Sequence, residues 1–306
     1  MSPGLSIIIP TFKRKDSLLR LLQALLAQKE VVPEIIVVDQ NPVGFLQEIL
    51  PAAPAIRHLI LPKPNASDAR NSGFLASSGE IILFIDDDLI PEADFCIRAL
   101  ELFQSYPAVE CFSPLVYNME GPDIALQQAK TKSIGSLDES SGIFAMTDTI
   151  SAAIFFRREY YRRTGGFDPM LFEFAKTAED QEFFLRMRKR KMTLYFVPAI
   201  SVYHDEKVPG GCDLRTDDYW ITREKCMKAW AYRYRIHHHP PGSLALGDVL
   251  QLARSGFLNR EVLLSGRKDL SRQIKLLKSS VRASREYLHA RLDRYSNVEE
   301  INHLAG

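Results

Sequence analysis

The sequence predicts an α/β fold in which a mainly parallel sheet is flanked by helices and followed by a helical C-terminal extension. In the first half of the 306 residues, short apolar runs alternate with amphipathic stretches. From Tyr219 onward the pattern is helical, with a break at Pro240-Pro241-Gly242. Strands that alternate with helices form mainly parallel sheets covered on both faces.

The apolar runs have the length and β-branched composition of buried strands, and the stretches between them have helical periodicity. From Asp16 to Gln28, leucines at 18, 19, 21, 22, 25 and 26 share one helical face, with Asp16 as the expected N-cap. We expect strands at 5–10, 34–39, 56–61 and 80–86, and helices at 16–28, 68–77 and 91–105. In the second half we expect strands at 109–117, 149–156, 193–197 and 200–204, and a helix at 179–189.

Composition and charge narrow the function classes. Hydrophobic residues make up 46% and charged residues 25%, as in an ordinary globular protein. Residues 220–306 carry a net charge of +8 and the rest of the chain −7, which argues against a nucleic-acid binder. A basic tail fits peripheral contact with a membrane surface, and a solvated basic helix face explains it equally well.

Cysteine spacing and the absence of long apolar runs predict the compartment. The cysteines are Cys96, Cys111, Cys212 and Cys226, and their wide spacing fits reduced thiols better than a zinc or redox motif. No secretory signal and no apolar run of about 20 residues is visible. We therefore expect a cytoplasmic protein, with peripheral association at the inner membrane face as a further expectation.

Polar side chains follow three of the expected strands. Thr11 and Lys13 come after the first strand, Asp39 after the second, and Asp86-Asp87-Asp88 after the fourth. Ligands of parallel sheets bind beyond the carboxyl ends of the strands, so these side chains are expected to line one crevice. Three adjacent carboxylates need compensating charge, which Mg²⁺ or Mn²⁺ would supply. The alternative is a solvated turn.

Six motifs together resemble family 2 glycosyltransferases, in the family's order. They are Ser6–Arg14, Ile36–Asp39, Asn65–Gly73, Phe84–Asp88, Gly165–Asp168 and Ala178–Phe183. The resemblance implies an inverting enzyme with a Rossmann-like GT-A fold and divides the chain accordingly. The expected catalytic domain is 1–218, with a nucleotide-sugar half of about 1–106 and an acceptor half of about 107–218, and 219–306 is the helical extension.

The resemblance also implies a role for each matching residue. Pro10 and Thr11 would line the base pocket, and Asp39 would hydrogen-bond the base. Arg70 would lie near the nucleotide with Asp68 as its helper, and Asp86 and Asp87 would contact the ribose and the sugar. Asp88 would hold the metal, with His204 as a further ligand, and Asp180 would be the general base. These assignments concern Pro10, Thr11, Asp39, Asp68, Arg70, Asp86, Asp87, Asp88, Asp180 and His204.

Structural alternatives stand beside several of these roles. Asp39 would otherwise cap a helix, Arg70 would pair with Asp68 or a triplet aspartate, and Asp180 would complement a helix dipole. His204 would otherwise pair with Asp205 or a backbone carbonyl. The chain also departs from the family, with Gln40-Asn41-Pro42 after the second strand and Ser67 where glycine is frequent.

The predicted activity is transfer of a sugar from a nucleotide-diphosphate sugar to a hydroxyl of a glycan or lipid-linked acceptor, by single displacement. Uridine is the default nucleotide, thymidine the alternative, and assembly of a bacterial surface polysaccharide the expected setting. A nucleotidyltransferase is the first competing class, although residues 10–14 contain no glycine to cradle a triphosphate. A non-catalytic sugar-nucleotide binding module is the second.

The C-terminal region adds two interpretations. Aromatic and basic residues mix in 219–235, and basic residues recur with leucines in 267–294, which suits anionic lipid or a lipid-linked diphosphate. A helix packed on the body with its basic side outward is the alternative. The run His237-His238-His239 is interpreted as a surface helix end, because consecutive helical side chains diverge.

Overall fold

The computed structural model describes residues 4–47, 49–130, 133–138, 142–175, 179–205 and 211. The predictions for Ala178 and for 219–306 lie outside these residues. The described residues belong to two compact units, of which the larger contains 4–167, 183–205 and 211. The smaller is represented by 168–175 and 179–182.

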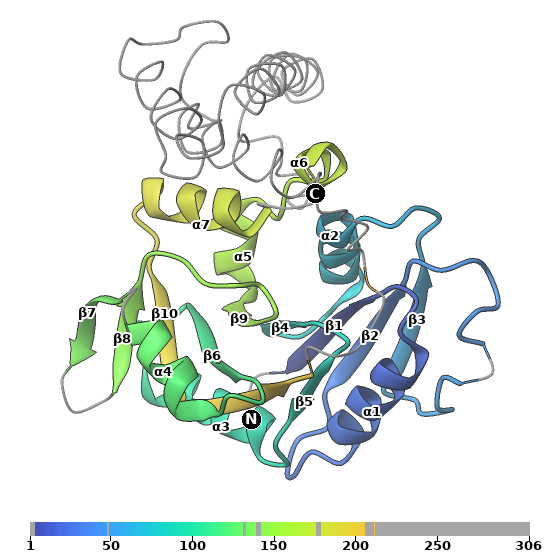
Figure 1. Cartoon of the computed structure of the whole chain (residues 1–306), viewed down its shortest axis with the longest axis horizontal. Helices are drawn as coiled ribbons and strands as arrows, with labels where there is room; N and C mark the ends of the chain where they lie inside the picture. The colour runs from blue at the N-terminus through green and yellow to red at the C-terminus, as the bar shows by residue number, and fades with distance from the viewer. Residues whose placement is uncertain are drawn as a thin grey trace, which may run out of the picture. The chain divides into compact units, whose positions relative to one another are not determined.

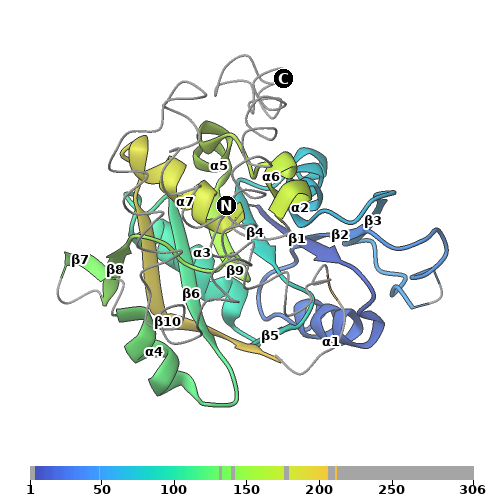
Figure 2. The ribbon, with the colours of Figure 1, turned by 45° about the horizontal axis from the view of Figure 1, so that its top comes forward.

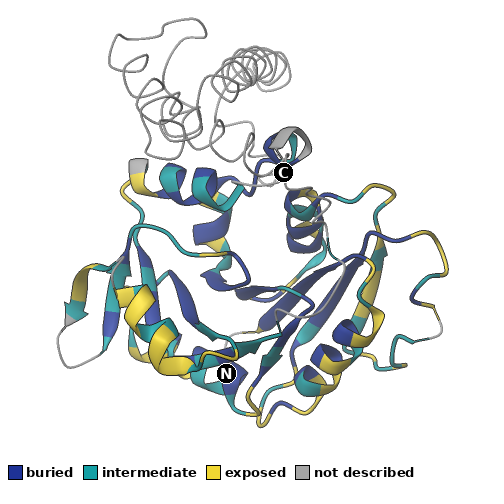
Figure 3. Cartoon of the chain, viewed as in Figure 1, coloured by how far each residue is buried: buried dark blue, intermediate teal, exposed yellow. Residues whose placement is uncertain are grey.

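The N-terminal half of the sheet is parallel, as predicted. Its strands lie in the order β3-β2-β1-β4 (Figure 1). Their bounds are β1 Leu5–Thr11, β2 Glu34–Asp39, β3 Ile56–Ile60 and β4 Ile81–Ile85. β1, β2 and β4 are almost completely buried, since helices cover both faces, whereas β3 is largely exposed at the sheet edge (Figure 3).

The sheet continues with mixed strand directions. β9 (Ala153–Arg157) runs antiparallel between β4 and β6 (Cys111–Tyr117), so β6 regains the direction of β4. β10 (Leu194–His204) is parallel to β6 and antiparallel to β8 (Ile143–Met146), which pairs with β7 (Ser133–Asp138). A short strand, β5 (Leu89–Pro91), pairs with the far end of β10.

Two expectations for β10 and its neighbours are corrected. The two short strands at 193–197 and 200–204 are one strand, whose pairing with β6 shifts register between Val197 and Ser201. Pro198 lies in this shift, where its missing N–H removes no regular ladder bond. The polar stretch after β6 holds α4 (Pro122–Lys130), β7 and β8, for which the sequence predicted no elements.

The helices of the larger unit flank the sheet, as predicted (Figures 1 and 2). The helix bounds are α1 Lys15–Leu26, α2 Ala66–Ala76, α3 Phe95–Ser105, α5 Arg158–Thr164, α6 Pro169–Ala175 and α7 Glu179–Lys189. α6 belongs to the smaller unit. Asn65 is the N-cap of α2, and its side chain accepts the Asp68 N–H. The Gly73 position lets α2 pack closely on the sheet, because a Cβ there would lie 2.3 Å from Ile8 Cγ2.

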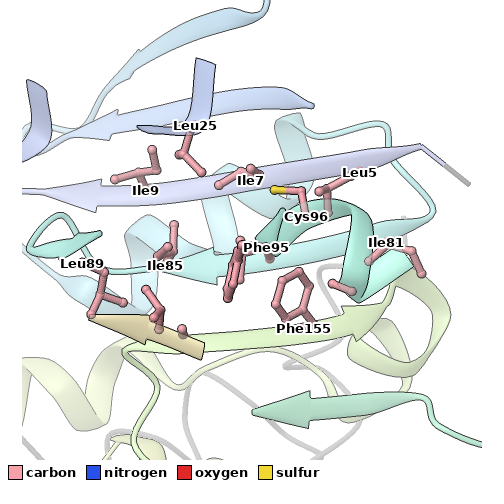
Figure 4. Close-up of a cluster of buried hydrophobic side chains, with 14 of the residues drawn as sticks. Leu5, Ile7, Ile9, Leu25, Ile81, Ile85, Leu89, Phe95, Cys96 and Phe155 are labelled. Atoms are coloured by element: carbon pink, nitrogen blue, oxygen red, sulfur yellow. The ribbon is translucent and has the colours of Figure 1, made fainter. Parts of the chain in front are cut away.

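Each face of the sheet carries its own hydrophobic core. Ile7, Ile9 and Leu83 point to one face with the apolar sides of α1 and α3, as the close-up in Figure 4 shows for Ile7, Ile9, Leu25, Phe95 and Phe155. Ile8 and Phe84 point to the other face, against α2, α5 and the part of α7 from Phe183. The strict alternation along each strand is that of a doubly covered sheet.

One helix start differs from the prediction in a way that bears on function. Asp16 lies in the first turn of α1, while the N-cap is Arg14, which makes no side-chain capping bond. The Arg14 side chain turns instead toward the carboxyl end of β4.

Within the part of the chain that the structure describes, no helix combines the length and apolar character needed to cross a membrane.

Candidate functional site

The carboxyl ends of β1, β2 and β4 meet at one edge of the sheet, as predicted. Thr11 is in register with Asp39 on β2, and β4 ends at Ile85, directly before the aspartate triplet. The buried Pro10 lies beyond the last β1–β4 pair, Ile8 with Phe84, so its missing N–H interrupts no bond to β4. The sheet therefore places Thr11, Asp39 and the triplet at one edge.

Two arginines neutralise the triplet from within the protein. Arg70 Nη2, on α2, donates to Asp86 Oδ1 at 3.0 Å. Arg14 Nη1 donates to Asp87 Oδ1 at 3.0 Å and to Asp88 Oδ2 at 2.5 Å. The expectation that a divalent cation must supply the compensating charge is therefore incomplete. For Arg70, the ion pair with a triplet aspartate is the alternative that the sequence left open.

Of the three aspartates, Asp87 is the most buried. Its Oδ2 accepts from the Thr11 hydroxyl at 2.7 Å, and the residue is 3% exposed. Burial raises the pKa of Asp87 to about 6, because the bonds from Thr11 and Arg14 only partly offset the loss of hydration.

Asp88 differs from Asp87 although it is adjacent. Burial opposes its ionisation, but the His204 hydrogen bond and the Arg14 charge outweigh burial, so the pKa of Asp88 is lowered. His204 Nε2 lies 3.4 Å from Asp88 Oδ2, because β5 and β10 pair Leu89 with His204. The structure thus brings together the two residues that the sequence proposed as metal ligands.

The chemistry of this pair fits a divalent cation. Asp88 Oδ1 is buried and accepts no hydrogen bond from another described residue, so a hard carboxylate oxygen remains for a ligand. Carboxylate oxygens suit Mg²⁺ and Mn²⁺, and neutral imidazole is a common metal ligand in proteins. Among the described residues, no group of three or more His, Cys, Asp or Glu could hold a metal ion. Water or a bound phosphate can supply further ligands.

Asp39 is held by its own turn and by β3. Its Oδ1 accepts from the backbone and side-chain nitrogens of Asn41, at 2.9 and 2.7 Å. Its Oδ2 lies 3.0 Å from His58 Nε2 on β3. It therefore does not cap a helix, and Oδ2 keeps acceptor capacity for one further donor.

The residues that depart from the family pattern support this edge. Asn41 Oδ1 accepts the Lys13 N–H at 2.8 Å, which joins the turn after β2 to the turn after β1. Gln40 Oε1 accepts the Asn65 N–H at 2.6 Å, at the start of α2. Ser67 is fully buried, and its hydroxyl has no hydrogen-bond partner among the described residues.

The Gly165–Asp168 motif has a structural role that the sequence did not assign. Gly165 ends α5 in the left-handed conformation (φ 89°), as glycine can without strain. Phe167 lies under the Arg70 guanidinium, 5.1 Å from ring centroid to Cζ. Asn71 donates to the Phe167 carbonyl at 2.8 Å and accepts the Phe167 N–H at 3.0 Å. The motif thus helps hold α2 and Arg70.

Two predicted site residues are placed individually. Asp68 is exposed in the first turn of α2. Asp180 is half-buried in the first turn of α7 with Glu179 and Glu182, where acidic side chains complement the helix dipole. Asp180 belongs to the smaller unit and the triplet to the larger one. Its role as a general base stays a prediction.

Sequence reasoning missed three residues of the site edge: Arg14, Asn41 and His58. Arg14 was part of the first motif but received no role. An acidic triplet at the end of a buried strand is itself a signal to search for a nearby arginine, because buried charges are paired.

Comparison with protein families identifies the chain. The family model described as glycosyl transferase family 2 matches residues 6–165, just over half of the chain. A glycosyltransferase of Nostoc sp., described as uncharacterized, is 23% identical over 54% of this chain and 54% of its own length. The poly(ribitol-phosphate) beta-N-acetylglucosaminyltransferase TarP of Staphylococcus aureus is 30% identical over 58% of this chain and 55% of its own length. The chain thus spans little more than half the length of these relatives.

Solved structures share the fold at low sequence identity. S. aureus TarS 1-349 in complex with UDP-GlcNAc has a TM-score of 0.61 and 16% identity, over 94% of this chain and 83% of that one. The mannosyltransferase PcManGT of Pyrobaculum calidifontis, in complex with GDP-Man and Mn²⁺, has a TM-score of 0.58 and 17% identity, over 97% and 88%. These similarities confirm the predicted GT-A-type fold. With the family match and the converging strand ends, they lead to one conclusion: the chain belongs to glycosyl transferase family 2.

Proposed function

We propose that this chain transfers a sugar from a nucleotide-diphosphate sugar to an acceptor hydroxyl, by single displacement with inversion. The observation that carries the proposal is the edge formed by β1, β2 and β4, where Thr11, Asp39 and the triplet converge on hydrogen-bonded positions, all of them buried except that of Asp86. Sugar nucleotides bound to TarS and PcManGT, which share the fold, support it further.

The nucleotide would be recognised at the β1–β2 side of this edge. Asp39 Oδ2 offers an acceptor to a base N–H, with Pro10 and Thr11 beside it on β1. UDP is the default donor nucleotide, with dTDP as the alternative. Arg70 and Asp68 would lie near the nucleotide, and Asp86 and Asp87 would contact ribose and sugar.

The negative charge of the diphosphate would be neutralised by a divalent cation held at Asp88 and His204. A divalent cation there, Mn²⁺ or Mg²⁺, would supply Lewis-acid stabilisation of the leaving diphosphate. The buried Asp88 Oδ1 and the His204 imidazole are the protein's ligands in this proposal.

The acceptor hydroxyl needs a base. We assign this role to Asp180, as the resemblance to the family implies. A carboxylate that accepts the hydroxyl proton during attack contributes about 10²–10⁴-fold to the rate. No covalent intermediate is required for inversion.

The acceptor is proposed to be a glycan or a lipid-linked glycan, in assembly of a bacterial surface polysaccharide. The relative TarP, named for its action on poly(ribitol-phosphate), supports a cell-surface polymer as the acceptor class. A cytoplasmic location with peripheral contact at the inner membrane face belongs to the same proposal. The location rests on the cysteine spacing, and the membrane contact rests on the basic composition of residues 220–306.

Calorimetric titration of the full chain with UDP, with and without Mn²⁺, tests the donor site. We expect micromolar binding that needs Mn²⁺ and weakens at least about tenfold, or about 1.4 kcal/mol, in Asp88→Asn. Asp94→Asn is the matched control, because Asp94 is a half-exposed carboxylate at the N-cap of α3. Binding of dTDP alone would change the donor, and binding of neither nucleotide would overturn the proposal.

A second experiment isolates the base. Asp180→Asn should keep UDP affinity within about twofold and lower sugar transfer by at least about 100-fold. Full activity in this variant would remove Asp180 from the mechanism and leave the donor site standing.

A further inference from the structure

One guanidinium nitrogen is shared by two buried carboxylates. Arg14 Nη1 contacts Asp87 Oδ1 and Asp88 Oδ2, and the three side chains are 17%, 5% and 7% exposed. Charge-assisted bonds of this length between buried groups are strong. Arg14 therefore already supplies a positive charge to the carboxylate that is proposed to hold the metal.

The position of this guanidinium is built into the fold. Arg14 follows Lys13, which has a left-handed backbone (φ 59°) and whose N–H is bound by Asn41. Gly211 donates its N–H to the Phe12 carbonyl at 2.9 Å and also has a positive φ of 77°. A Cβ at Gly211 would lie 3.0 Å from Arg14 Cζ, so the backbone there approaches the guanidinium closely. Contacts from separate parts of the chain thus enclose Arg14.

A metal ligand that already carries a guanidinium cannot accept a divalent cation unchanged. A metal ion on Asp88 Oδ1 would share one carboxylate with the guanidinium on Oδ2, and two cations that close repel each other, more strongly away from bulk water. His204 also contacts Asp88 Oδ2, but it is charged only when it is protonated. Arg14 is always charged, so it is the partner whose charge opposes a metal ion.

We propose that Arg14 is the built-in counter-cation of Asp87 and Asp88, and that a divalent cation binds Asp88 only by displacing the Arg14 guanidinium from it. The inference rests on the proposed metal-dependent donor site. Without a metal, Arg14 keeps the buried aspartates neutralised. When a metal binds, Arg14 leaves Asp88 and retains Asp87.

The displacement has a consequence for the order of binding. The metal alone must compete with Arg14, so its affinity is low. A donor diphosphate brings negative charge that stabilises the metal and the released guanidinium together. Binding of metal and nucleotide is therefore positively coupled, and Arg14 is the source of part of that coupling.

The test is direct measurement of Mn²⁺ binding to the full chain without nucleotide, by electron paramagnetic resonance or calorimetry. Arg14→Gln should tighten Mn²⁺ binding by about tenfold, and the enhancement of Mn²⁺ affinity by UDP should shrink correspondingly. Lys15→Gln removes the same charge from the next, exposed residue, and it should change affinity less than about twofold. Unchanged or weaker Mn²⁺ binding in folded Arg14→Gln would overturn the inference.

Thermal melting supplies a second readout. Without metal, Arg14→Gln should melt below the wild type, and Mn²⁺ should raise its melting temperature more than that of the wild type. If Arg14→Gln does not fold, Arg14→Lys replaces it, because an ammonium bridges two carboxylates less well than a guanidinium. That variant should tighten Mn²⁺ binding by about threefold, and no change would overturn the inference.

The outcomes separate this inference from the proposed function. A wild type that binds neither Mn²⁺ nor UDP refutes both. A wild type that binds both and loses Mn²⁺ in Asp88→Asn, while Arg14→Gln leaves the affinity unchanged, refutes only the counter-cation role.

Discussion

Asn71 joins α2 to the turn after α5, and its removal should destabilise both the core and the donor site. It accepts the Tyr161 hydroxyl at 2.8 Å and the Phe167 N–H at 3.0 Å, and it donates to the Phe167 carbonyl at 2.8 Å. Tyr161 and Phe167 are fully buried. In Asn71→Leu, the buried hydroxyl and the Phe167 backbone groups lose their partner, while a branched side chain of similar length remains.

The magnitude follows from those three bonds. Each contributes about 1 kcal/mol net, and a buried donor left without a partner costs about 1–3 kcal/mol. We therefore expect the free energy of unfolding to fall by about 3–5 kcal/mol. Arg70 should lose orientation as well, because it pairs with Asp86 and lies over the Phe167 ring.

The assay is urea unfolding of the wild type, Asn71→Leu, Tyr161→Phe and the double variant. Because Tyr161→Phe removes the hydroxyl that Asn71→Leu strands, the double variant should be less destabilised than the sum, by about 1 kcal/mol or more. Asn118→Ala is the control, since Asn118 accepts one bond from the exposed Glu120 backbone. A loss below about 1 kcal/mol in Asn71→Leu, or strict additivity, would refute the reasoning.

Three smaller predictions follow. Ser67→Ala should raise the free energy of unfolding by about 1 kcal/mol in thermal melting, because it deletes a buried hydroxyl without a partner; a loss of stability would show that the hydroxyl is bonded. For Glu34, burial is outweighed by bonds from Ser6, Ser78 and Arg57, so its folded pKa is lowered. Its stabilisation is present above the unfolded pKa, so the advantage of wild type over Glu34→Gln in urea melts should shrink between about pH 5 and pH 3 and not at neutral pH. His58→Phe should weaken UDP binding by about 3–10-fold in calorimetry, because one side of Asp39 Oδ2 loses its partner; unchanged affinity would separate Asp39 from base recognition.

Local pattern was sufficient for the first half of the fold. The runs at 5–10, 34–39 and 80–86 are strands within one residue of the predicted bounds, because a doubly buried strand must be apolar along its length. The leucine spacing of α1 works in the same way, since one helical face must cover the sheet. The strand-end position of Asp39 and the triplet also followed from sequence, because parallel strands share a carboxyl edge.

Pattern failed where pairing or exposure replaces periodicity. α4 has no buried residue and is mostly exposed in Figure 3, so no strong apolar face marks it. In β7, Ile134 is exposed, and the pairing with β8 is irregular. The apolar residues of β7 therefore do not alternate as they would in a strand with one buried face. The register shift in β10 depends on β6, which lies far away in the sequence.

The same division holds for the site. The sequence by itself determined which residue types stand at the strand ends, and their ordered motifs determined the family. Only the tertiary structure decided which residues pair with these carboxylates. Arg14 contacts Asp88, which is 74 positions away in the sequence, and His58 contacts Asp39, which is 19 positions away. Charge pairing is a matter of distance in space, and burial fixes it by removing the water that would otherwise solvate each partner.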